Sequence, residues 1–156
     1  MTLLALAGFV LAVCAAAATG SLFRPGPWYD GLSKPAWTPP NRLFPVAWAL
    51  LYLAIAIAVW RVVLRPSPLA TAALAFWTCQ LVISALWSPV VFGLRRLDAG
   101  LAVIAALLAA VVATLVLFAR VDALAGWLLV PYAAWVVFAG ALNFAVWRRN
   151  PPGAAH

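Results

Sequence analysis

The residues most able to bind or react with another molecule lie in one polar and aromatic stretch between two apolar runs. It begins at Arg24 as R-P-G-P-W-Y-D-G-L-S-K-P-A-W-T-P-P-N-R and leads into an apolar segment that reaches Tyr52. Its large rings stand among five prolines, which stiffen the backbone. Connectors that only join helices are usually rich in Gly and Ser and lack aromatic residues. The stretch therefore predicts a structured wall or lid of a binding site, and the alternative is a connector whose rings lie at headgroup level.

A second group of polar and aromatic residues recurs at helical spacing near the C-terminus. Tyr132, Trp135, Ala139 and Asn143 fall on one face of a helix. Ala139 beside Trp135 places a gap next to a ring, which leaves room for a flat ligand but also suits simple helix packing.

A similar stripe follows the polar stretch. Trp48, Leu51, Tyr52 and Ile55 share one helical face. Such a stripe is more often helix packing than the wall of a ligand site, but the aromatic loop beside it favours the ligand interpretation.

The residues needed for conventional catalysis or metal binding are missing. The sequence has no glutamate, its three aspartates lie near expected helix ends or in the loop, and its one histidine is His156. Cys14 and Cys79 lie inside apolar runs without a CxxC spacing, so we expect both to be small buried apolar residues. The sequence predicts no metal site, no catalytic residues of a hydrolase or redox enzyme, and no obligatory cofactor.

The composition is that of a polytopic membrane protein. Of 156 residues, 68% are hydrophobic and 8% are charged, whereas soluble domains are about half apolar and a quarter charged. Apolar runs of about 20 residues can span a bilayer. The chain is predicted to be one all-α membrane domain, 1–156, with five transmembrane helices and a structured Pro/Trp-rich loop between the first two. The expected helices cover about 3–23, 42–64, 69–92, 99–118 and 123–147, and the tail 150–156 is expected to be disordered.

The charges predict an orientation. The net charge of +7 comes from cations beside the apolar runs, so it indicates contact with lipid phosphates and not binding of nucleic acid. Five spans place three of the ten cations at one membrane face and seven at the other, where the aromatic loop lies. The positive-inside rule then predicts an external N-terminus and an internal C-terminus. The sequence does not distinguish an inner from an outer membrane.

Several polar and small residues have expected structural roles. Thr38 is a candidate N-cap of the second helix, and Asp98 and Asp122 are candidate caps of the fourth and fifth. Gln80 lies mid-span, where its amide needs a partner on another helix. In the first helix small residues recur every fourth position from Gly8, which fits close packing within the chain as well as a homodimer interface.

Three segments together resemble one known family. W-Y-D-G-L-S-K-P-A-W-T-P-P at 28–40, P-V-A-W-A-L-L-Y at 45–52 and V-P-Y-A-A-W-V-V-F-A-G-A-L-N at 130–143 are similar to the TspO/translocator protein family, also called peripheral-type benzodiazepine receptors. The resemblance implies a five-helix bundle, often a homodimer, with a pocket open toward the first loop. It also implies porphyrins such as protoporphyrin IX, sterols and synthetic isoquinoline carboxamides as ligands.

The resemblance carries over to individual positions. Trp28 and Trp135 match a tryptophan pair that faces the ligand from opposite sides, Trp48 matches another pocket aromatic, and Ala139 matches a small residue beside the ligand. Lys34 and Arg42 flank the loop and are candidates to pair with porphyrin propionates, or with lipid headgroups. The expected ligand contacts are Trp28, Trp37, Trp48, Tyr52, Tyr132, Trp135, Phe138, Ala139, Leu142 and Asn143.

Two positions depart from the family pattern. Ser84 stands where the family often has asparagine, so polar contacts on the third helix differ. The sterol motif of the fifth helix expects a tyrosine, and this chain has Phe144 between Leu142 and Arg148. We therefore regard sterol as a doubtful ligand.

These observations predict a membrane receptor for tetrapyrroles and other flat apolar ligands, with a role in porphyrin handling, sensing or light-dependent degradation. Any reaction would draw on the photochemistry of the bound porphyrin, with Trp28 and Trp135 as electron-exchange partners. The alternatives are a passive translocator of apolar ligands and a regulatory or assembly partner of other membrane proteins. No His or Met lies in the expected helices to ligate haem iron, so we expect metal-free porphyrin to bind at least as well as haem.

Overall fold

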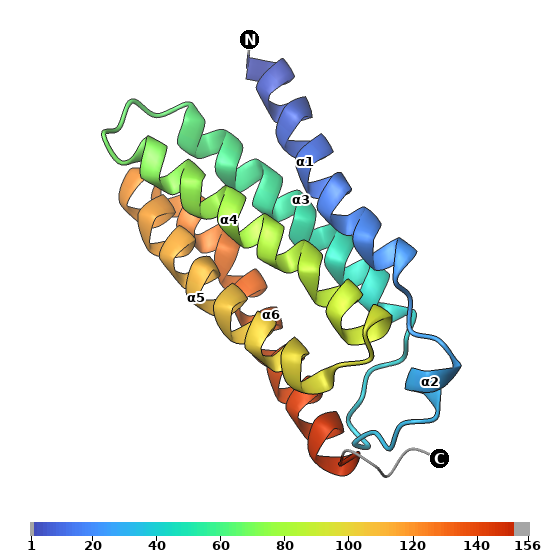
Figure 1. The fold of residues 1–156 in the computed structure, drawn as a ribbon. Coiled ribbons are helices and arrows are strands. Elements are labelled where there is room, and N and C mark those ends of the chain that lie inside the picture. Colours follow the sequence, from blue (N-terminus) through green and yellow to red (C-terminus); the bar gives the residue numbers. More distant parts are fainter. Residues whose placement is uncertain (1, 152–156) are drawn as a thin grey trace.

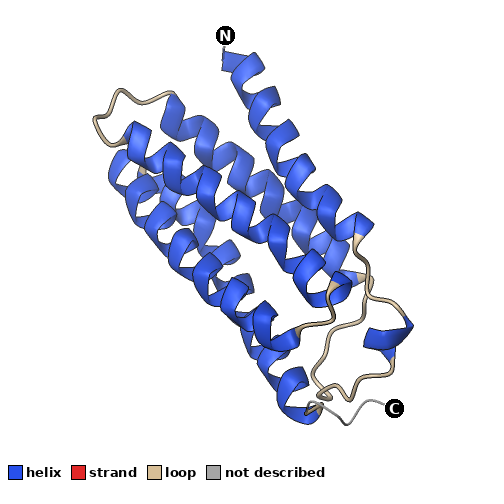
Figure 2. Cartoon of the chain, viewed as in Figure 1, coloured by secondary structure: helices blue, strands red, loops and turns tan. Residues whose placement is uncertain are grey.

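The computed structural model describes residues 2–151, with the side chains described from residue 3, and within that range the chain is built from helices and loops (Figure 1, Figure 2). The elements are α1 (Thr2–Leu22), α2 (Pro27–Asp30), α3 (Leu43–Val63), α4 (Ala70–Ser88), the π-helical turn η1 (Pro89–Gly93), α5 (Leu97–Val121) and α6 (Ala123–Arg149).

Five of these helices are long and apolar enough to cross a membrane. They cover Leu3–Leu22, Leu43–Val63, Ala70–Gly93, Leu97–Val121 and Ala123–Arg149, with mean hydropathies between 1.6 and 3.0. The prediction of an all-α, five-span bundle is confirmed. The largest difference is α5, which extends past both ends of the predicted 99–118. At its C-terminal end, Arg120 can continue the helix into the interface with its charged group in water.

The five long helices form one bundle, and α1 packs on the outside of the other four. α5 packs along α6, α6 packs against α3, and α4 packs on α5. α1 lies over α3 and α4, and its first half diverges from the bundle in Figure 1. Helix α1 begins at one end of the bundle and α6 finishes at the other, next to α2 (Figure 1).

The end of the bundle opposite α2 is closely packed. Ile55, Val59 and Val62 of α3 are fully buried there, and so is Phe118 of α5. A Cβ atom on Gly126 would lie 2.5 Å from the Cβ of Ala119, so only glycine permits this approach of α6 to α5.

Asp122 joins three helices at the closed end. It is the single residue between α5 and α6, and its carboxylate accepts a hydrogen bond from the Ala125 amide at 3.0 Å, which confirms the predicted cap of the last helix. The same carboxylate accepts from Arg61 of α3 at 2.8 and 3.1 Å and from Arg65 at 3.1 Å. The arginine contacts have no signal in the sequence, because Arg61 lies 61 residues from Asp122.

Two predicted caps are wrong. The hydroxyl of Thr38 donates to the Pro35 carbonyl at 2.7 Å, and α3 begins later, at Leu43. The prolines at 39 and 40 and the turn that follows them delay the helix. Asp98 lies inside the first turn of α5 and pairs with Arg96 at 2.7 Å, so it is not the residue before the helix.

The two cysteines are also placed differently from the prediction. Cys14 and Cys79 are exposed on the outer surfaces of α1 and α4 and face lipid in an integral membrane protein. In a bilayer the hydrophobic effect does not drive an apolar residue toward the protein interior, so an apolar run does not indicate which face is buried.

Most of the small-residue stripe of α1 faces its own chain. Ala16 is buried, Ala12 packs against the core, and a Cβ atom on Gly20 would lie 3.7 Å from Ser88 of α4. Gly8 has no neighbour within 4 Å. Packing within the chain accounts for three of the four positions, and the homodimer stays a prediction.

The loop between α1 and α3 is fixed to the end of α6. The backbone N–H of Ser33 donates to Asn150 Oδ1, and Asn150 Nδ2 donates to the Ser33 carbonyl, both at 2.9 Å. Lys34 donates to the carbonyls of Asp30 and Leu32 and so holds the turn after α2. Asn150, the first residue of the predicted disordered tail, is therefore fixed in place, and residues 152–156 lie outside the described range.

Replacing Asp122 tests the closed end of the bundle. Asp122→Ala should lower the stability by about 1–2 kcal/mol through the lost cap, seen as a drop of several degrees in the thermal midpoint in detergent. Asp98→Ala is the matched control, since its ion pair is exposed and contributes little. An equal effect of both substitutions would contradict the assigned role of Asp122.

The same residue predicts a pH dependence. The hydrogen bonds from Arg61 hold the pKa of Asp122 below its usual 3.8, at about 2. A carboxylate with a lowered folded-state pKa stabilises the fold above its unfolded pKa and loses that contribution as the pH falls. The difference in thermal midpoint between the native chain and Asp122→Ala should be constant well above pH 3.8 and shrink as the pH falls toward about 2.

Candidate functional site

The half of the bundle nearest the loop encloses a cavity of about 690 Å³. This volume is within the range of roughly 300–1,000 Å³ that is typical of small-molecule sites. The cavity is lined by the last turns of α1, the first turns of α3, the end of α4 with η1, and facing positions of α5 and α6. The bundle is thus closely packed at one end and hollow at the other.

Aromatic rings from α3 and α6 form one wall of the cavity. Trp48 and Trp135 meet edge to face with their centroids 6.5 Å apart, and Tyr52 stacks on Trp48 at 5.2 Å. Phe44 contacts Trp135 at 5.8 Å. Because each ring is held by another, the wall is a preformed aromatic surface.

Small residues on several helices leave the space open. Ala16, Ala17 and Gly20 line the cavity from α1, Ala49 does so from α3, and Ala139 from α6. A side chain that ends at Cβ does not reach across the gap between helices. The predicted gap beside Trp135 is therefore part of a larger void.

The π-helical turn η1 shapes the side of the cavity formed by α4. Pro89 has no N–H to donate to the preceding turn, and the Leu94 amide donates to the Pro89 carbonyl at 2.9 Å, five residues back. This wider turn places Val91 and Phe92 in the cavity lining. The sequence predicted a helix through residue 92 but not its change of pitch.

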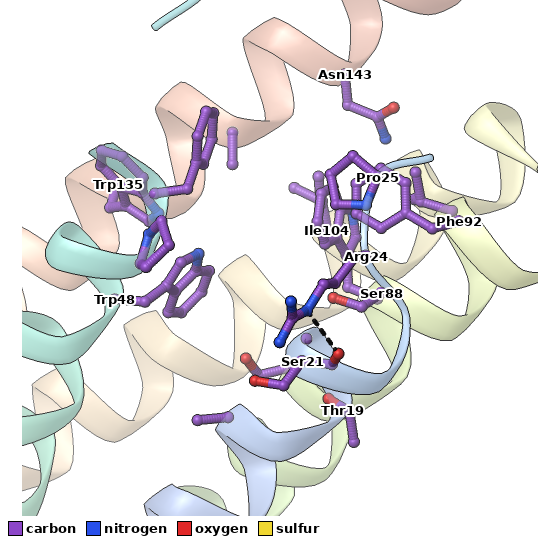
Figure 3. Close-up of a pocket in the computed structure, with 18 of the residues that line it drawn as sticks. Thr19, Ser21, Arg24, Pro25, Trp48, Ser88, Phe92, Ile104, Trp135 and Asn143 are labelled. Carbon is purple, nitrogen blue, oxygen red and sulfur yellow. Dashed lines mark hydrogen bonds between the residues drawn. The ribbon is translucent and has the colours of Figure 1, made fainter. Parts of the chain in front are cut away.

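The polar groups of the cavity gather toward its loop end. Figure 3 shows Arg24 extending over the space across from Trp48 and Trp135, with Ser21 and Ser88 near it. Arg24 is the one charged residue among the described residues that line the cavity, and its Nε donates to the Ser21 carbonyl at 2.9 Å. Its terminal nitrogens have no partner among residues 2–151 and can donate to an anionic group.

Tyr29 adds a neutral hydroxyl at the loop end. It lines the cavity from α2 and contacts Phe92 edge to face at 5.3 Å. Burial, with a smaller effect of the Asp30 charge, raises the pKa of Tyr29. The phenol is therefore uncharged at neutral pH and acts as a hydrogen-bonding group.

A buried hydrogen bond supports the aromatic wall from behind. Tyr132 is fully buried and donates to Gln80 Oε1 at 2.9 Å, which confirms that Gln80 bonds across to another helix. Trp48 packs edge to face on Tyr132 at 6.2 Å.

Six of the ten expected ligand contacts line the cavity. They come from two helices that are about 80 residues apart in the sequence and are brought together by the bundle. They are Trp48, Tyr52, Trp135, Ala139, Leu142 and Asn143.

Trp28 does not line the cavity in this structure. It packs against the apolar cluster that includes Leu32, Val91 and Leu142, while its neighbour Tyr29 faces the cavity. The expected position of Trp28 opposite Trp135 across one pocket is therefore not observed. A direct role of Trp28 in binding stays a prediction.

The other three expected aromatic contacts form a layer behind the lining. Phe138 packs on Trp135 at 5.5 Å, and Trp37 of the loop packs on Phe138 at 5.8 Å, while Tyr132 lies behind Trp48. None of the three is among the lining residues. They hold the rings that are.

The two expected propionate contacts also lie away from the cavity. Lys34 extends over the ring of Tyr29 at 4.7 Å and binds loop carbonyls, and Arg42 is exposed just before α3. Neither lines the cavity. Among the described residues, Arg24 is the cation that lines the cavity.

Sequence reasoning missed several lining residues, and Arg24 matters most among them. The sequence did contain an indication of its position, because Arg24 is the first charged residue after an apolar run and immediately precedes a proline. Trp87, whose Nε1 is buried without a hydrogen-bond partner in the described chain, also lines the cavity. Its helical face is shared with Ser84, but nothing in the spacing indicates that α4 turns this face toward a void.

The cavity is suited to binding more than to acid–base chemistry. The described residues hold no group of three His, Cys, Asp or Glu side chains that could bind a metal ion. The lining offers rings, hydroxyls, two asparagines and one arginine. Such a surface stacks on an apolar plane and fixes an anionic edge.

Comparison with known proteins points to one family. The family model described as TspO/MBR family matches residues 9–148. Protein CrtK of Rhodobacter capsulatus is 50% identical over 97% of this chain and 96% of its own length. The tryptophan-rich sensory protein of Cereibacter sphaeroides is 43% identical over 90% and 88%, and the human translocator protein is 36% identical over 92% and 88%.

The hydrogen bond behind the wall gives a double-substitution test. Tyr132→Phe leaves the Gln80 side chain buried without its partner, which should cost about 1–3 kcal/mol. Gln80→Leu combined with Tyr132→Phe should cost less than the sum of the two single changes, as measured by thermal unfolding in detergent. Additive losses would contradict the pairing.

Proposed function

The chain belongs to the TspO/MBR family, and on that premise we propose that it is a membrane receptor that binds tetrapyrroles such as protoporphyrin IX in the cavity near the loop. The names of its relatives support a sensory or binding role in a membrane. The family resemblance seen in the three sequence segments is confirmed, and the multi-pass membrane location follows from it and from the five apolar helices.

The cavity is the main observation in support of this proposal. A metal-free porphyrin presents a large flat apolar face, and the cavity offers a preformed wall of Trp48, Trp135 and Tyr52. Each aromatic contact contributes about 0.5–1.5 kcal/mol beyond burial. Small side chains of the lining, such as Ala16 and Ala139, leave enough space for the thickness of a flat ligand.

The arginine at the loop end supports the proposal that acidic tetrapyrroles are preferred. Porphyrin propionates are carboxylates, and a guanidinium group donates two parallel hydrogen bonds to a carboxylate. Arg24 has terminal nitrogens that no described side chain engages, and Asn41 and Tyr29 lie in the same part of the lining. The ligand would lie with its ring against the wall and its propionates toward the loop.

The positions of the ionisable residues favour binding over ion-coupled transport. Ion-coupled carriers place ionisable side chains or broken helices near the midplane. The ionisable groups of the described helices lie at their ends, apart from cysteine and tyrosine, and the buried polar residues inside the bundle are Gln80, Ser84, Thr114 and Asn143. The cavity is open to passive passage of an apolar ligand, and counterflow in sealed liposomes would reveal that activity.

Arg24→Gln tests how the cavity recognises the ligand. The substitution should weaken protoporphyrin IX binding about tenfold or more, because a charge-assisted hydrogen bond is lost. The measurement is a titration by tryptophan fluorescence quenching in detergent or nanodiscs. Arg42→Gln is the matched control, since it removes the same charge at the same end from a residue that does not line the cavity.

The dimethyl ester of protoporphyrin IX separates charge recognition from loss of fold. It keeps the ring and lacks the carboxylates, so native protein and Arg24→Gln should bind it equally. Equal loss of acid and ester binding would indicate damage to the cavity, and an unchanged affinity for the acid would overturn the role of Arg24. A larger effect of Arg42→Gln would return the propionate contact to Arg42.

A further inference from the structure

A second, smaller pocket lies at the opposite end of the bundle from the cavity. Its volume is about 250 Å³, and Trp60, Arg61, Leu64, Arg65 and Asp122 line it. It lies where α3 ends and α6 begins, at the edge of the apolar span Leu43–Val63. None of its residues lines the larger cavity.

The carboxylate in this pocket is already saturated with donors. Asp122 Oδ1 accepts from Arg61 Nε at 3.1 Å and from the Ala125 amide at 3.0 Å. Asp122 Oδ2 accepts from Arg61 Nη2 at 2.8 Å and from Arg65 Nε at 3.1 Å. Arg61 alone pairs with the carboxylate in bidentate fashion, so Arg65 is a second cation for which only one donor is matched.

The pocket therefore carries a net positive charge and unmatched donors. Two guanidinium groups and one carboxylate leave a formal charge of +1 by simple count. The side chain of Arg65 is 57% exposed while the carboxylate is 4% exposed, so the cationic side of the cluster faces outward. The terminal nitrogens of Arg65 have no partner among residues 2–151. An arginine held at its Nε presents these nitrogens in a fixed plane, which suits a phosphate.

An apolar surface adjoins the unmatched donors. Trp60 and Leu64 line the same pocket, and Leu64 is 44% exposed. Tryptophan at the end of a spanning helix typically lies at headgroup level, and arginine beside it meets lipid phosphates. A ligand that satisfies both surfaces has a phosphate joined to an apolar chain.

We propose that this pocket is a binding site for an anionic glycerophospholipid. Arg65 donates to the lipid phosphate, Arg61 supplies positive charge while it stays on Asp122, and Trp60 and Leu64 contact the apolar part next to the headgroup. Asp122 acts as a positioning residue, because it holds Arg65 at Nε. The bound lipid lies against the junction of α3 with α6 and stabilises the closed end of the bundle. This proposal is independent of tetrapyrrole binding.

Native mass spectrometry of the full chain with defined lipids tests the proposal. The native protein should retain phosphatidylglycerol about tenfold more strongly than phosphatidylcholine, on the scale of one charge-assisted phosphate contact. Arg65→Gln should abolish this preference. Arg120→Gln is the matched control, because Arg120 is exposed at the same end and does not line the pocket. It should keep the preference, and Arg65→Lys should keep part of it.

The outcomes that overturn the proposal are distinct. Equal retention of the two lipids by the native protein would show that no headgroup-selective site exists. An equal loss in Arg120→Gln would show that diffuse surface charge attracts the lipid. Displacement of phosphatidylglycerol by millimolar inorganic phosphate would show a site for the free anion instead of a lipid. Circular dichroism and tetrapyrrole titration of each variant identify any that fail to fold.

Discussion

The close contact of α5 with α6 around Asp122 is the constraint on which the rest of the structure depends. With one residue between them, the two helices must run antiparallel and in contact, and Gly126 against Ala119 permits the approach. Asp122 then accepts from Arg61 and fixes α3 to the same junction. Once these three helices are fixed at one end, Trp48 of α3 and Trp135 of α6 are directed toward each other at the other end.

The hollow end of the bundle can persist because the closed end holds the helices. A cavity lined by alanine, glycine and aromatic rings forgoes the dispersion contacts that a packed core would gain. In a membrane the exposed faces of the helices gain little by moving inward, so the void does not collapse as it would in water. Asn150 and Ser33 hold the loop across the same end and keep Tyr29 and Arg24 at the cavity. The physical basis of the proposed tetrapyrrole site is a preformed void with an arginine that can donate hydrogen bonds to an anionic group.

The sequence predicted the spans and much of the cavity wall, because apolar length and helical spacing report them directly. Tyr52, Trp135 and Ala139 follow from periodicity and from the family resemblance. The sequence could not predict that Tyr29 lines the cavity while Trp28 does not, since a four-residue helix within a proline-rich loop sets which of these neighbouring rings reaches it. Nor could it predict the partners of Asp122, which lie 57 and 61 residues away. The exposed positions of the cysteines follow from packing, on which an evenly apolar helix carries no information.

Titration of protoporphyrin IX into the chain with its cavity filled tests the central claim most directly. Ala139→Phe places a ring in the cavity, and Ala141→Phe adds the same ring on an exposed face of α6 outside it. Followed by tryptophan quenching, the first substitution should weaken binding about tenfold or more through overpacking, and the second should leave the affinity unchanged. Unaltered binding by Ala139→Phe would show that the tetrapyrrole does not occupy this cavity.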